Sequence, residues 1–182
     1  MVTPKPQSKS MQSRGKVIIW KFILTYILLM GFFLLLIGLE PVKNIIDING
    51  LYSGMIVKLT AAFLNIFDLV QGTHGSILSM KRGLSLDVKF GCNGLEAFLI
   101  YAIAILSFPA NKWQKLAGIG IGFIGLQVIN ILRIALLAVC GIYFREIFHY
   151  VHIYIAQGVM IAVAVIFFLK WLNYATKSPN PA

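Results

Sequence analysis

Long apolar runs dominate this chain and limit it to a membrane fold. Several of them reach the ~20 residues needed to cross the hydrocarbon core of a bilayer. Hydrophobic residues make up 59% of the 182 residues, whereas a soluble domain has about 45–50%. We therefore expect an all-α integral membrane protein, a multi-span helical bundle that forms one domain over residues 17–173. The expected spans are residues 17–39, 93–108, 116–143 and 151–173.

Both ends of the chain are polar. Residues 1–16 are basic and contain two prolines, which predicts a disordered tail, and residues 174–182 form a second short tail. The apolar run at 17–39 is longer than the apolar region of a signal peptide, and no small-x-small cleavage site follows it. This pattern favours an anchor that is retained.

The region between the first two spans is expected to lie on the outer side of the membrane. Residues 51–71 are a weaker apolar segment with helical spacing, which predicts an amphipathic helix that is interfacial or re-entrant. A tilted span is the alternative. Residues 76–89 alternate on either side of Lys81, Arg82 and Gly83, which predicts a small β-hairpin.

The distribution of charge sets the orientation of the spans. The net charge is +10, and the N-terminal tail, the loop at 109–115 and the C-terminal end carry basic residues without an acid. The loops expected on the opposite side carry four acids, which are Glu40, Asp47, Asp87 and Glu146. Basic loops remain in the cytoplasm, so four spans with both termini in the cytoplasm fit this pattern. The positive charge is then a topology signal, and nucleic acid is not an expected partner.

This topology brings ionisable residues from three spans to one level. Cys92 lies at the outer start of its span, with Glu96 one turn deeper. Arg133 lies ~27 Å above Lys115 at 1.5 Å per residue. His152 lies at the outer start of the last span. Ionisable groups inside a membrane are costly and indicate function. A thiolate–histidine pair beside a fixed cation can attack a carbonyl and stabilise the oxyanion. Alternatively, a single cysteine packs as a small hydrophobic residue.

The two cysteines, Cys92 and Cys140, occur without a CxxC motif, which argues against a metal site or a disulfide framework. We expect neither a metal nor a cofactor. Cys140 is expected to be structural, because free cysteine packs well among apolar side chains.

Three segments, CNGLEA, INILRI and VHIYIAQ, occur in this order on successive expected spans. Together they resemble the exosortase/archaeosortase family of integral-membrane cysteine transpeptidases, most closely the exosortase H type. The resemblance covers residues 17–173. It implies that Cys92 is the nucleophile, that Arg133 is required with Asn130 as its companion, and that His152 is the histidine, with His149 in reserve.

The resemblance also implies a substrate class and a location. The substrates would be exported proteins with a C-terminal sorting signal, which consists of a short motif, a transmembrane helix and a basic cluster. Cleavage would proceed through a Cys92 thioester near the periplasmic face of the bacterial inner membrane, with transfer to an unknown acceptor nucleophile. Two alternatives stay open, namely a hydrolytic cysteine protease and a non-enzymatic small-solute transporter or assembly subunit.

Three further residues are expected to support the site. Asn93 either donates to the oxyanion or caps a helix start, where asparagine is favoured. Glu96 is expected to pair with Arg133, because an unpaired carboxylate would raise the pKa of the nearby thiol. Gln157 completes the His-x-Tyr-x-x-Gln pattern that begins at His152.

Overall fold

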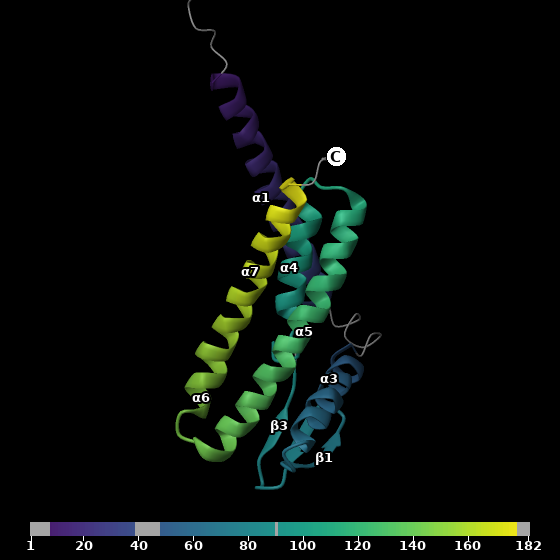
Figure 1. Ribbon diagram of the computed structural model, residues 1–182, viewed down its shortest axis with the longest axis vertical. Coiled ribbons are helices and arrows are strands. Elements are labelled where there is room, and N and C mark those ends of the chain that lie inside the picture. Colours follow the sequence, from purple (N-terminus) through teal and green to yellow (C-terminus); the bar gives the residue numbers. More distant parts are fainter. Residues whose placement is uncertain (1–7, 39–47, 90, 178–182) are drawn as a thin grey trace, which may run out of the picture.

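The computed structural model describes residues 8–38, 48–89 and 91–177. Helices dominate it, and a small antiparallel sheet accompanies them (Figure 1). In chain order the elements are α1 (Ser8–Gly38), α3 (Ile48–Asn65), β1 (Val70–His74), β2 (Ile77–Met80), β3 (Ser85–Asp87), α4 (Leu95–Ser107), α5 (Lys112–Tyr143), α6 (Phe148–Tyr150), the π-helical turn η1 (Val151–Ile155) and α7 (Ala156–Lys177). The helical membrane fold with a small β-element is therefore confirmed.

Helices α1, α4, α7 and the first half of α5 lie side by side at one end of the molecule (Figure 1). Glycines of α5 allow its neighbours to approach closely, because a Cβ at Gly122 would lie 2.0 Å from Tyr101 Cε1, and one at Gly118 would lie 2.3 Å from Trp171 Cδ1. Small residues serve this purpose where helices pack within lipid. Tyr101 and Trp171 are buried there with Leu126, and they form the core between the helices.

Among the described residues, three helical segments are long and apolar enough to cross a membrane, and they lie at Ile19–Leu36, Lys112–Tyr143 and Phe148–Lys177. They correspond to three of the four expected spans. The fourth, expected at 93–108, is helix α4, which has 13 residues. At 1.5 Å per residue it is ~20 Å long, shorter than the ~30 Å hydrocarbon core, so the span at 93–108 stays a prediction.

Several boundaries differ from those expected. Helix α1 begins at Ser8, within the segment predicted to be a disordered tail, and α7 extends to Lys177 rather than ending at 173. Helix α5 begins at Lys112 instead of 116, because the Asn111 side chain accepts a hydrogen bond from the Trp113 N–H as an N-cap. Residues 1–7 and 178–182 of the expected tails, with Glu40 and Asp47, lie outside the described residues.

The predicted hairpin is present as β2 and β3, which pair antiparallel with Leu78 opposite Leu86. A third strand, β1, was not predicted. The expected helix at 51–71 ends at Asn65 as α3, Asp68 takes a left-handed φ of 55°, and the chain returns as β1 along β2. Aspartate is one of the few residues that adopt this conformation readily.

The sheet and α3 form a second cluster beside the second half of α5 (Figure 1). Its buried members from these three elements include Ile56, Val57, Leu64, Leu78, Met80, Ile134 and Ala138. Helix α3 is not among the three candidate spans, and its apolar face is used to pack the sheet against α5. The loop that follows β3 therefore leaves this cluster and enters the helical bundle at the start of α4.

Candidate active site

The loop that carries Cys92 is a tight turn between β3 and α4. Gly91 and Gly94 have φ values of 91° and 78°, a conformation that other residues adopt only with strain. Within the turn, the Cys92 and Asn93 N–H groups both donate to the Lys89 carbonyl, at 2.9 and 3.1 Å. The turn therefore fixes Cys92 at the N-terminal end of α4.

Asn93 is committed to holding this turn. Its side chain is fully buried, its Nδ2 donates to Ser53 Oγ at 3.1 Å, and its Oδ1 accepts the Leu95 N–H at 3.1 Å. Of the two roles considered from the sequence, the geometry supports the cap, because Oδ1 accepts the N–H of Leu95, the first residue of α4, and the side chain is fully buried. Ser53 belongs to α3, and sequence reasoning missed it. Its place on the buried face of an amphipathic helix was the available signal.

His152 lies beside Cys92. Its Nε2 is 3.4 Å from Cys92 Sγ, a hydrogen-bonding distance for sulfur, although the two residues are 60 positions apart. The Phe148 ring stacks on the imidazole, with centroids 5.7 Å apart and planes 17° apart. The reserve candidate, His149, is exposed and contacts the Tyr150 ring instead. Of these two histidines, the structure therefore brings His152 to the thiol.

Arg133 reaches the same loop from α5. Its side chain is almost fully buried, and Nη2 donates to the carbonyl oxygens of Cys92 and Gly91, at 2.9 and 3.4 Å. A guanidinium that binds two successive carbonyls restrains the backbone of the loop. The Arg133 cation therefore lies next to the Cys92 backbone.

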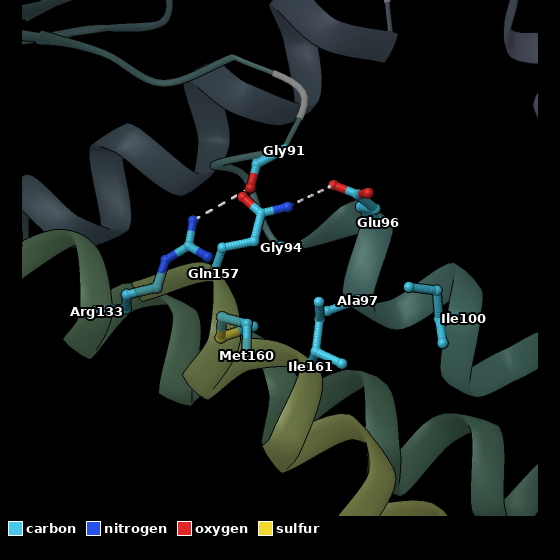
Figure 2. Close-up of a pocket in the computed structure, with 9 residues that line it drawn as sticks. All are labelled: Gly91, Gly94, Glu96, Ala97, Ile100, Arg133, Gln157, Met160 and Ile161. Atoms are coloured by element: carbon cyan, nitrogen blue, oxygen red, sulfur yellow. Dashed lines mark hydrogen bonds between the residues drawn. The ribbon is translucent and has the colours of Figure 1, made fainter. Parts of the chain in front are cut away.

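Glu96 does not pair with Arg133, which corrects the prediction from the sequence. Among the described residues Glu96 makes no ion pair, and its Oε2 accepts a hydrogen bond from Gln157 Nε2 at 3.3 Å. Figure 2 shows the Gln157 amide between the Arg133 guanidinium and the Glu96 carboxylate. The pair is not formed because α7 inserts this amide while Arg133 turns toward the loop carbonyls.

Asn130, expected to accompany Arg133, is fully buried beneath Gly94. Among the described residues, neither Oδ1 nor Nδ2 of Asn130 has a hydrogen-bond partner. The Asn130 side chain contacts the site by packing against Gly94 of the turn. Cys140 lies in α5 as a free thiol.

Burial and two charged side chains determine the electrostatic environment of the thiol. Burial raises the pKa of Cys92, the Arg133 charge opposes this shift, and the Glu96 charge adds to it. The net direction is upward, because burial outweighs the lowering effect of the Arg133 charge. This direction favours the neutral form of the thiol, beside which the His152 imidazole lies.

A pocket opens next to the turn, between α4, α5 and α7. Figure 2 shows polar side chains of Glu96, Arg133 and Gln157 on one side and apolar side chains on the other. The apolar residues are Ala97, Ile100, Met160 and Ile161, and Gly91 and Gly94 complete the lining. Among the described residues there is no group of histidine, cysteine and acidic side chains that could hold a metal ion. The arrangement suits covalent chemistry on a carbonyl.

The chain matches the family model described as transmembrane exosortase over residues 17–170, which is most of its length and includes Cys92, Arg133 and His152. No curated protein and no solved structure matches the chain. Members of such a family are membrane transpeptidases or proteases.

Proposed function

Because the chain belongs to the transmembrane exosortase family, we propose that it is a membrane cysteine transpeptidase that cleaves the C-terminal sorting signal of exported proteins. The observation that carries the proposal is the 3.4 Å contact between Cys92 Sγ and His152 Nε2. A thiol within reach of an imidazole is the arrangement that nucleophilic catalysis by cysteine requires. The Arg133 guanidinium, bound to the Cys92 carbonyl oxygen at 2.9 Å, adds a positive charge beside the thiol and the imidazole.

The first half of the reaction uses His152 as base and then as acid. His152 Nε2 takes the proton from Cys92 Sγ, and the thiolate attacks the scissile carbonyl carbon. The C–N bond breaks as His152 returns the proton to the leaving amine, which leaves the substrate acyl group as a Cys92 thioester. The neutral resting thiol requires this base, because burial raises its pKa.

In the second half, an acceptor nucleophile replaces the leaving amine. His152 takes its proton, the acceptor attacks the thioester carbonyl, and the C–S bond breaks as His152 returns the proton to Cys92 Sγ. If water were the acceptor, the same residues would carry out hydrolysis. Arg133 holds the loop throughout and places a positive charge near the oxyanion, which electrostatic stabilisation favours.

The proposed location is the bacterial inner membrane, with both termini in the cytoplasm. The start of α1 and the end of α7 lie at the same end of the molecule (Figure 1), and the basic residues Lys112 and Lys115 begin α5 at that end. The Cys92 turn lies at the opposite end of α4, which supports a site that faces the periplasm.

The test uses cells or vesicles that contain the enzyme and an exported protein with a C-terminal sorting signal. We expect Cys92→Ala to accumulate at the normal level and leave the substrate uncleaved, whereas Cys140→Ala processes it. Mass spectrometry of the new C-terminus then identifies the reaction, because an added group indicates transfer and a free carboxylate indicates hydrolysis. Normal processing by Cys92→Ala would refute the proposal.

A further inference from the structure

His152 and Gln157 both face the Cys92 turn, although they are five residues apart. In an α-helix with 3.6 residues per turn, each residue advances about 100°, so residues five apart point in widely different directions. The π-helical turn Val151–Ile155 removes this offset. Its closing hydrogen bond runs from the Ala156 N–H to the Val151 carbonyl, five residues back, and this accommodates one extra residue in the turn.

The outer side of this turn makes few contacts with the rest of the protein. Ile153, Tyr154 and Ile155 are exposed, with Tyr154 at 69%. The inward contacts are the Phe148 ring on His152 and the His152 contact with Cys92. If the turn became α-helical at constant length, His152 would rotate by about 100° and leave the thiol. A contact just after the turn is in a position to set its rotation.

That contact is the hydrogen bond from Gln157 Nε2 to Glu96 Oε2, at 3.3 Å. Among the described residues it is the one side-chain hydrogen bond that joins α7 to α4. Glu96 lies one turn after Cys92 on α4, and Gln157 directly follows the first residue after the π turn. A carboxylate acceptor makes such a bond stronger than a neutral one.

We propose that Glu96 and Gln157 are positioning residues that fix the rotation of the π turn and so hold His152 against Cys92. This inference rests on the proposed function, in which His152 acts on Cys92. It assigns Glu96 a partner on α7 in place of Arg133. It also explains a carboxylate beside the nucleophile whose charge otherwise opposes ionisation of the thiol, because the oxygen is used to hold α7.

The test measures the rotation directly, without relying on catalysis. In a Cys140→Ser background, Val151→Cys, His152→Cys and Ile153→Cys are made one at a time in the full-length protein in membranes. Each is treated with a short bifunctional thiol reagent that can link it to Cys92. We expect position 152 to cross-link best.

With Glu96→Leu or Gln157→Leu added, the yield of the cross-link at position 152 should fall several-fold relative to the yields at positions 151 and 153.

Activity of the otherwise unaltered enzyme provides the second readout. Glu96→Leu should lower kcat about tenfold or more with little change in KM. Glu96→Gln, which keeps an acceptor oxygen, should retain most of kcat, and so should the exchange Glu96→Gln with Gln157→Glu. If Glu96→Leu fails to fold, Gln157→Leu and the exchange still test the proposal.

Two results would overturn the positioning role. One is an unchanged cross-linking pattern in both leucine variants, and the other is a loss of kcat in Glu96→Gln that equals the loss in Glu96→Leu. Failure of the proposed function is separate, because it would appear as normal substrate cleavage by Cys92→Ala while the cross-linking pattern still reported on the π turn.

Discussion

Gly94 lies directly against Asn130. A Cβ added to Gly94 would come within 2.8 Å of both Cγ and Nδ2 of Asn130, which is fully buried on α5. Gly94 also has a φ of 78°. The turn that presents Cys92 is therefore seated on α5 at a point where neither a side chain nor a different backbone conformation fits.

Gly94→Ala should displace the turn and strongly reduce activity. The left-handed conformation costs a residue with a Cβ roughly 1–2 kcal/mol, and the clash with buried Asn130 adds to it. The measurement is substrate cleavage together with the protein level in membranes. Gly120→Ala and Gly158→Ala are matched controls, because nothing lies within 4 Å of an added Cβ at either position. Equal activity of Gly94→Ala and the controls would contradict the close seating of the turn.

Ser53→Ala should loosen the same turn from the side of α3. It removes the acceptor for Asn93 Nδ2 and leaves a buried donor without a partner, which costs about 1–3 kcal/mol. We expect a lower thermal unfolding midpoint in detergent and faster alkylation of Cys92. Thr60→Val is the control on the same helix, because the Thr60 hydroxyl donates to the Ile56 carbonyl one turn earlier. If Ser53→Ala changed neither the unfolding midpoint nor the alkylation rate of Cys92, α3 would not support the loop.

The reactivity of Cys92 should depend on pH in a defined direction. Burial and the Glu96 charge raise the pKa of the thiol, and Arg133 lowers it. Since only the thiolate reacts with iodoacetamide, the midpoint of labelling in a Cys140→Ser background should lie above that of a free cysteine. Arg133→Leu should move the midpoint higher and Glu96→Gln should move it lower. A midpoint below that of free cysteine would show that an activated thiolate is already present in the resting enzyme.

Much of the architecture could be predicted from the sequence because it depends on local patterns. Apolar runs mark the long helices, and alternation around Lys81 and Gly83 marks the hairpin. Strand β1 was not predicted, because it lies at the edge of the sheet and four of its five residues are exposed. It therefore shows no alternation of buried and exposed residues. The π turn was also missed, because VHIYI reads as a continuation of one apolar helix.

Some features of the candidate site could be predicted from the sequence, and others depend on how the helices pack. The meeting of Cys92 with Arg133 and His152 follows from topology, since three helices bring them to one level. The partner of Glu96 does not, because it depends on which side chain of α7 lies between Glu96 and Arg133. The direction of the Cys92 pKa shift depends on burial by surrounding segments, which spacing along the chain does not reveal.

The most direct test of the central claim is to trap the covalent intermediate. The enzyme in a membrane or detergent is mixed with a sorting-signal substrate in the absence of added acceptor, and the intact mass and the site of modification are measured. We expect an acyl adduct on Cys92 that neutral hydroxylamine removes. The adduct should be absent from Cys92→Ala and present in Cys140→Ala. In His152→Ala we expect its formation to slow by about 10²–10⁴, the usual contribution of a general acid–base. Cleavage without an adduct on Cys92, or an adduct that survives in Cys92→Ala, would contradict the proposed mechanism.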